Sequence, residues 1–397
     1  MANSERDYFD LKGKRAEQVL YELAAKTFLT DWCYLNPRLP DGKELCDLLV
    51  VFNDVAIIWQ VKDLKVREDG KPKQAEVEKN LRQIAGARRQ LFELRRAVEL
   101  ENPRRGREML DVASIRDVFL VSALLGEEVE FFSAVEDFKN LTIHVFDAEF
   151  TRLVLKELDT VSDFVEYLRA KERLLDKNKS LIVVGGEQEL LAFYLMNDKS
   201  FTRLDEADHV VIEKGSWAHL QGKPAYKAKK KADEVSYGWD SIIERAHEGS
   251  RQYELVAREL ARPNRFQRRY LSKVFLEAWG QAHKDTIRDM YRRVLVIDGA
   301  TYCFLFADDA GPRERRRAML GALCLVARGK FQSNKRVLGI ATEKRIRPTC
   351  SYDFCLLEID EWLPTHQEQM EALQKAAGIL VNPEFGRTYE EEYPKDD

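Results

Sequence analysis

Two apolar runs joined by Asn53-Asp54 constrain the fold of this chain of 397 residues more than any other feature. The runs, residues 48–52 and 55–61, are rich in Val, Ile, Phe and Trp and contain few polar residues. This pattern is typical of β-strands that are covered on both faces. Because Asn and Asp both tolerate positive φ, Asn53-Asp54 is a suitable two-residue turn. The sequence therefore predicts a buried β-hairpin.

Three polar residues stand at the open end of this predicted hairpin. If Asn53-Asp54 forms the loop, Asp47 lies directly opposite Gln60, with Cβ atoms about 5 Å apart. The side chain of Lys62 then points to the same face as Gln60, because side chains along a strand alternate. A shift of the turn by one residue would place Asp47 on the opposite face from Gln60. The convergence of the three groups therefore depends on the register.

The chemistry of these side chains suits a divalent cation. Asp47 offers an anionic oxygen and Gln60 a neutral carbonyl oxygen, and Mg²⁺ prefers such hard ligands while retaining water. Lys62 would orient a water or help to deprotonate it, and would stabilise charge that develops on a phosphate. The alternative interpretation is a plain strand pair whose ends carry solvated charges. For the three residues together we favour the metal site.

A predicted helix over residues 13–29 adds a fourth polar group. Glu17 lies in line with Leu20, Ala24 and Phe28, at the edge of the apolar stripe of this helix. A carboxylate directed toward a protein core is costly unless it is paired or bound to a metal. The alternative is that Glu17 only borders the stripe and reaches water. Helical periodicity alone does not decide between the two.

Glu17, Asp47 and Lys62, in this order, resemble the motif of the PD-(D/E)xK, or restriction-endonuclease-like, nuclease superfamily. The pattern of that family is a helical Glu, an Asp that opens a strand, and (D/E)xK at the end of the next strand. Gln60 replaces the usual acid and is similar to the Gln-x-Lys variant of Mrr-type endonucleases. This replacement removes one negative charge and should weaken metal affinity. Cys46 stands where the family has Pro before its Asp.

The resemblance implies an α/β domain with a restriction-endonuclease-like mixed sheet flanked by helices. It further implies hydrolysis of phosphodiester bonds, with Mg²⁺ or Mn²⁺ held by Asp47, Gln60 and Glu17 and with Lys62 assisting the nucleophile. Double-stranded DNA would be the substrate. A role in bacterial defence or restriction is compatible with the resemblance. So is assembly into a homo-oligomer or with a partner protein of a defence system. One alternative is an inactive module of the same fold that binds nucleic acid or a protein. Another is an interaction scaffold with no nucleic-acid contact.

A basic segment follows the predicted hairpin. Residues 76–99 are predicted to form one long helix, and residues 76–107 carry nine basic and five acidic side chains in a chain whose net charge is −4. Phosphate contacts are local, so a basic helix after the catalytic strand is a candidate surface for nucleic acid. The alternative is an ordinary solvated helix face. The candidate contacts are Arg82, Arg88, Arg89, Arg95 and Arg96.

The length of the chain suggests two or three domains. Alternation of predicted strands and helices extends the nuclease-like domain over residues 1–175, and the polar stretch 176–180 is the expected boundary. Residues 181–397 are expected to form an α+β domain that serves recognition, sensing or oligomerisation. Within it, the lysine-rich run 227–231 is expected to be a solvated loop. The acidic tail 388–397 is expected to be disordered.

Composition restricts the cellular setting. No apolar run approaches the ~18 residues of a membrane span, and the first residues lack an apolar signal segment. The six cysteines are scattered and form no CxxC pair. We therefore expect a cytoplasmic protein with reduced thiols and no membrane partner.

Overall fold

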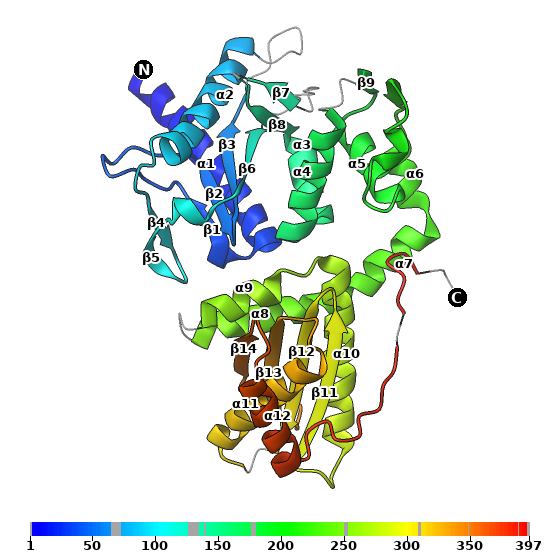
Figure 1. The fold of residues 1–397 in the computed structure, drawn as a ribbon. Helices are drawn as coiled ribbons and strands as arrows, with labels where there is room; N and C mark the ends of the chain where they lie inside the picture. The colour runs from blue at the N-terminus through cyan, green and yellow to red at the C-terminus, as the bar shows by residue number, and fades with distance from the viewer. Residues whose placement is uncertain are drawn as a thin grey trace. The chain divides into compact units, whose positions relative to one another are not determined.

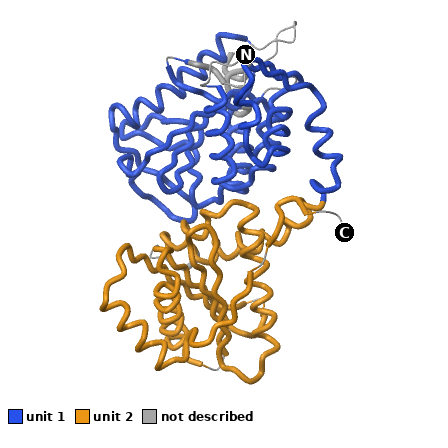
Figure 2. Tube along the Cα trace, turned by 45° about the vertical axis from the view of Figure 1, so that its right-hand side comes forward, with its two compact units in different colours: residues 1–227 blue, residues 228–397 orange. Residues whose placement is uncertain are grey.

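The computed structural model describes residues 2–64, 73–125, 135–138, 140–175, 180–249, 253–308, 311–347, 349–387 and 389–394. Helices and mixed β-sheets alternate along the chain (Figure 1). The chain divides into two compact units, residues 1–227 and residues 228–397 (Figure 2). The expected α/β class is thus confirmed at the level of mixed sheets flanked by helices.

A six-stranded mixed sheet forms the centre of unit 1, in the order β1-β2-β3-β6-β8-β7. β2 runs antiparallel to β1 and β3, β6 runs parallel to β3 and β8, and β7 is antiparallel to β8. The strands are β1 (Cys33–Leu35), β2 (Leu48–Phe52), β3 (Val55–Lys62), β6 (Asp117–Leu124), β7 (Val135–Asp137) and β8 (Thr142–Asp147).

The predicted hairpin is confirmed with its register. Leu48 pairs with Trp59 and Phe52 pairs with Val55, so the loop consists of Asn53 and Asp54. Asn53 has a φ of 54°, the left-handed conformation for which a turn residue such as Asn is suited. All five residues of β2 and the first seven of β3 are buried, because helices cover both faces of the sheet.

Alternate residues of β2 and β3 pack against different helices. Leu49, Val51 and Ile58 belong to a core cluster with the apolar residues of α2 (Gln74–Arg88). Trp59, on the other face, stacks on Phe164. That face is covered by α1 (Ala2–Phe28), α3 (Ala148–Glu157) and α4 (Val161–Leu175). Asp47 and Gln60, which continue the alternation of Leu49 and Ile58, are therefore placed on the α2 face.

The prediction of one long helix over residues 76–99 is wrong at the C-terminal end. α2 ends at Arg88, a π-helical turn covers Arg89–Glu93, and Arg95 has a φ of 45°. The chain then enters β4 (Glu99–Asn102), which pairs antiparallel with β5 (Gly106–Met109). Burial of Val98 and Leu100 in the core beside α2 explains the break, because a continuing helix would not place both in that core.

The segment after α4 belongs to unit 1. The sequence suggested a domain boundary at residues 176–180, and residues 176–179 lie outside the described residues. Lys171 of α4 forms a buried ion pair with Glu187 of the next helix, and Tyr167 packs edge-on against Tyr194. The segment contains β9 (Ser180–Val183), α5 (Glu187–Met196), β10 (His209–Ile212) and α6 (Ser216–Gly222). The compact units accordingly divide after Lys227, within α7 (Pro224–Asp233).

Unit 2 has a four-stranded sheet in the order β11-β12-β13-β14, in which only β12 and β13 are parallel neighbours. Phe304 of β12 packs on Phe275, and the adjacent Cys303 and Leu305 point into a core shared with the helices of the opposite face. The strands are β11 (Met290–Ile297), β12 (Ala300–Ala307), β13 (Arg336–Glu343) and β14 (Asp353–Glu358). The helices are α8 (Tyr237–Gly249), α9 (Glu254–Ala261), α10 (Arg265–Lys284), α11 (Arg313–Lys330) and α12 (Pro364–Ala377).

Two predicted flexible segments are ordered in unit 2. The lysine-rich run, expected as a loop, belongs to α7, where Lys229 pairs with Asp233 at 2.5 Å. The acidic tail was expected to be disordered, but the backbone carbonyls of Glu391 and Glu392 accept hydrogen bonds from Arg269. A buried guanidinium needs acceptors, and this requirement fixes the described part of the tail, residues 389–394. Residues 388 and 395–397 lie outside the described residues.

Candidate functional site

Polar residues occupy the same level on four neighbouring strands of the unit 1 sheet. Asp47 stands one residue before β2 and Gln60 near the end of β3, and the register pairs Gln60 with Ser122 of β6. On the other side, the Asn36 amide donates a hydrogen bond to the Asp47 carbonyl at 3.0 Å. Asp47, Gln60 and Ser122 are all buried, although they continue otherwise apolar strands.

Asp47 and Gln60 are in direct contact, as the predicted register requires. Asp47 Oδ2 accepts hydrogen bonds from Gln60 Nε2 and from the Val61 amide, each at 2.6 Å. The pKa of Asp47 is raised to about 7, chiefly by burial and also by the nearby negative charges of Glu17 and Glu44. The two hydrogen bonds act in the opposite direction, because they favour the ionised form. The environment of Asp47 is thus costly for a carboxylate in the absence of a cation.

Glu17 reaches this site from α1. Glu17 Oε2 accepts a hydrogen bond from Asn36 Nδ2 at 3.0 Å, and the Glu17 charge acts on Asp47. Asn36 therefore links the two residues: its side chain contacts the Glu17 carboxylate, and its amide contacts the backbone carbonyl of Asp47. Asn36 was not predictable from the sequence, because its role depends on the pairing of β1 with β2.

The four residues predicted as catalytic line one hollow of unit 1. These are Glu17, Asp47, Gln60 and Lys62. The structure thus brings the predicted constellation together, with Lys62 at the end of β3 on the same side of the hairpin as Gln60. The remaining lining residues are Gly13, Lys14, Ala16, Glu44, Val61, Asp63, Lys73, Glu76, Lys79 and Gln83.

α2 contributes a polar stripe to the site, of which Glu76 and Lys79 were not predicted. Glu76, Lys79 and Gln83 lie three and four residues apart, so they share one face of the helix and all line the hollow. Their spacing was a usable signal, but the recurring arginines on another face of the segment were more conspicuous. Among the described residues that line the hollow, the basic groups are all lysines: Lys14, Lys62, Lys73 and Lys79.

The arginines predicted to bind nucleic acid lie elsewhere on the surface of unit 1. None of the five is among the described residues that line the hollow. Arg82 pairs with Glu78 at 3.6 Å, and Arg88 and Arg89 both pair with Glu93. Arg96 pairs with Asp41 at 3.3 Å. Exposed ion pairs of this kind contribute little, about 0–1 kcal/mol, so these arginines can exchange partners at small cost.

The donor set fits a hard divalent cation of the Mg²⁺ type. Within the described ranges, no group of three or more His, Cys, Asp or Glu side chains is arranged to hold a metal ion. Mg²⁺, however, is commonly bound by one or two carboxylates together with water and substrate phosphate oxygens. Asp47 and Glu17 provide two carboxylates, while the Gln60 amide directs its nitrogen toward Asp47, so its oxygen would face the acids only after the amide group rotates.

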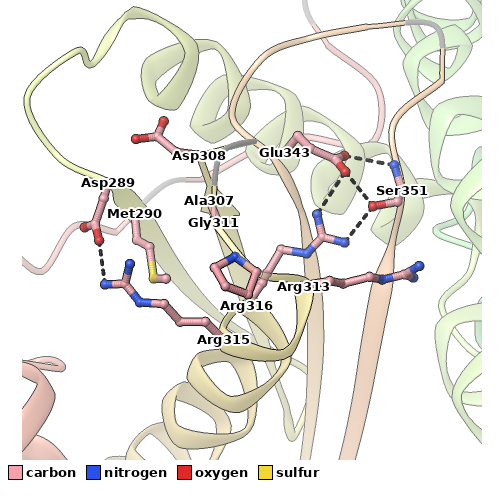
Figure 3. Close-up of a pocket in the computed structure, with 11 residues that line it drawn as sticks. Asp289, Met290, Ala307, Asp308, Gly311, Arg313, Arg315, Arg316, Glu343 and Ser351 are labelled. Atoms are coloured by element: carbon pink, nitrogen blue, oxygen red, sulfur yellow. Dashed lines mark hydrogen bonds and ion pairs between the residues drawn. The ribbon is translucent and has the colours of Figure 1, made fainter.

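A second hollow lies in unit 2, where the carboxyl ends of β12 and β13 meet the start of α11. Figure 3 shows Arg316 reaching Glu343 and Ser351, while Arg315 pairs with Asp289. Three arginines and three acids line this hollow: Arg313, Arg315, Arg316, Asp289, Asp308 and Glu343. The charges of the lining therefore balance.

Comparisons of the chain with family models, with curated proteins and with solved structures found no match. Across the described part of the chain, no helix has both the length and the apolar character that crossing a bilayer requires.

Proposed function

We propose that this protein is a metal-dependent nuclease that hydrolyses phosphodiester bonds in double-stranded DNA. The single observation that carries the proposal is the convergence of Glu17, Asp47, Gln60 and Lys62 on one hollow at the open end of the β2–β3 hairpin. Acids that can hold Mg²⁺ and an amine that can stabilise charge on a phosphate suit metal-assisted phosphodiester hydrolysis.

Each residue has a role that follows from its chemistry and position. Asp47 and Glu17 would hold Mg²⁺ or Mn²⁺, and the Gln60 amide would complete the protein ligands. The bound cation would polarise a phosphoryl oxygen and lower the pKa of a water. Lys62 would orient that water and stabilise negative charge on the phosphate. Burial of Asp47 beside an otherwise apolar strand strengthens its interaction with a cation.

The arrangement of unit 1 supports a restriction-endonuclease-like fold. An antiparallel hairpin carries Asp47, Gln60 and Lys62, a parallel strand follows through α2, and α1 brings Glu17 from the other helix layer. The exposed arginines at residues 82–96 are proposed to contact the DNA backbone, because their surface ion pairs are readily exchanged for phosphates. The protein would act in bacterial defence, together with a second copy or a partner protein. Unit 2 would serve as its recognition or sensing element.

One observation favours a second candidate, an inactive module that binds nucleic acid or a protein. Gln60 Nε2 donates a hydrogen bond to Asp47, whereas the acid that the family has at this position would repel Asp47. Gln60 thus stabilises Asp47 without a metal, as expected for an inactive site. An inactive module would retain salt-sensitive DNA binding without cleavage, whereas an interaction scaffold would show no such binding.

The deciding experiment incubates the full chain with supercoiled plasmid and with linear duplex DNA, in Mg²⁺, Mn²⁺ or EDTA. We expect metal-dependent cleavage that is lost, by at least about 100-fold, in Asp47→Asn and in Lys62→Ala. Asp54→Asn, in the turn at the other end of the same hairpin, and Lys156→Ala, on the exposed face of α3, serve as matched controls.

Two results would contradict the proposal. Cleavage that persists in both Asp47→Asn and Lys62→Ala would assign the activity to another site or to a contaminant. Duplex DNA binding without cleavage by the wild-type chain, in either metal, would favour the inactive module. The controls should cleave at the wild-type rate.

A further inference from the structure

We propose that Asn36 is a positioning residue that holds Glu17 beside Asp47 and thereby sets the affinity of the site for a divalent cation. The inference rests on the proposed function, because it assigns the contact to the same metal site. Its basis is that Asn36 contacts the Glu17 carboxylate through its side chain and the backbone carbonyl of Asp47 through its amide, and so links two different elements of unit 1.

The backbone of Asn36 is fixed by the end of the sheet. Asn36 follows β1 directly, and its amide donates to the Asp47 carbonyl at 3.0 Å, one step beyond the last β1–β2 pair, Leu35 with Leu48. Its φ of 48° lies in the left-handed region, which Asn tolerates better than most residues. This conformation ends the strand while keeping residue 36 level with Asp47.

The side chain of Asn36 carries the contact to Glu17. A carboxylate only accepts hydrogen bonds, so the amide nitrogen of Asn36 must face Glu17 Oε2, at 3.0 Å. This orientation leaves Asn36 Oδ1 buried, with no hydrogen-bond partner among the described residues. An unsatisfied buried acceptor costs about 1–3 kcal/mol, so the contact is expensive as a purely structural bond.

The cost is understandable if the orientation of Glu17 matters to a ligand. Glu17 stands on a helix and has a flexible side chain, whereas Asp47 is held by two hydrogen bonds of 2.6 Å. Without Asn36, the Glu17 carboxylate would lose the donor that links it to the level of Asp47. Partners that orient metal ligands in this way typically contribute 10- to 100-fold to metal affinity.

Asn36→Gly tests the inference most cleanly, because glycine accepts the left-handed backbone and removes only the side chain. We expect the Kd for Mn²⁺, measured by titration calorimetry on the full chain, to rise about 10-fold. In a Glu17→Ala background, the same change should raise the Kd less than about 2-fold, because the acceptor of the Asn36 hydrogen bond is already removed. Asn140→Gly is the matched control, since Asn140 is exposed and has a φ of 62°.

The outcomes separate this inference from the function on which it rests. If the wild-type chain binds Mn²⁺ and Asn36→Gly leaves the Kd unchanged, the positioning role is wrong and the proposed nuclease stands. An equal rise of the Kd in both backgrounds would also overturn it, because the effect would not pass through Glu17. If the wild-type chain neither binds Mn²⁺ nor cleaves DNA, both proposals fail. Asn36→Ala, which removes the donor to Glu17 without adding a charge, should weaken Mn²⁺ binding similarly if the glycine variant folds poorly.

Discussion

As the pH rises, the free energy of unfolding of unit 1 in Asp47→Asn should increase relative to that of the wild type. The pKa of Asp47 is raised from 3.8 to about 7, so the folded state binds a proton more tightly than the unfolded state. Between these two values, a rise in pH therefore destabilises the wild-type protein, and above pH 7 the full cost of about 4 kcal/mol is present. Asn carries no charge and escapes this dependence.

The measurable quantity is the difference in unfolding free energy between the variant and the wild type at several pH values. The linkage relation gives a change of about 2–3 kcal/mol in favour of Asp47→Asn between pH 5 and pH 8. Any loss of hydrogen-bond quality in the variant adds a constant offset and leaves this change intact. Urea unfolding in EDTA, followed by hydrogen exchange of peptides from β2 and β3, reports on unit 1 alone.

A flat difference across this pH range would refute the reasoning about the burial of Asp47. Asp54→Asn, the same substitution in the turn of the hairpin, should vary by less than about 0.5 kcal/mol. Saturating Mn²⁺ should stabilise the wild type through the ionised Asp47 and should leave Asp47→Asn nearly unchanged. Equal stabilisation of both proteins by Mn²⁺ would place the cation elsewhere.

Two further substitutions test the polar contacts of unit 1. Gln60→Glu replaces a hydrogen-bond donor to Asp47 by a like charge, so the melting temperature at pH 8 in EDTA should fall. Mn²⁺ should then raise the melting temperature by more than it does in the wild type. An equal response to Mn²⁺ in both proteins would contradict a ligand role at position 60. Lys171→Met leaves the buried Glu187 without its cation and should cost about 3–5 kcal/mol in urea unfolding of unit 1. A loss below about 1 kcal/mol would show that the ion pair is not needed.

The hairpin was predictable because local signals agreed on its register. A turn of Asn53-Asp54 between two apolar runs fixes which residues face each other, and Asp47 and Gln60 follow from that pairing alone. Glu17 was only half predictable. Helical periodicity placed it at the edge of a stripe, but its proximity to Asp47 depends on how α1 crosses the sheet.

Long-range pairing explains the features that sequence reasoning did not find. The residues after Arg88 are good helix formers without Gly or Pro, yet β4 pairs with β5 and Leu100 enters the core, so tertiary contacts overrule local propensity. The fixed position of the tail likewise depends on Arg269, which lies more than one hundred residues earlier in the chain.

The energetics of the polar row argue for a functional rather than a structural role. Asp47, Gln60 and Ser122 replace apolar residues in strands that are otherwise closed to water. A neutral Asn at position 47 would still accept hydrogen bonds through its oxygen and would avoid the cost of about 4 kcal/mol that ionised Asp47 imposes. Stability alone therefore disfavours the residue that is present. A bound cation would reverse this balance, since it would attract the ionised carboxylate, so the burial of Asp47 supports the proposed metal site.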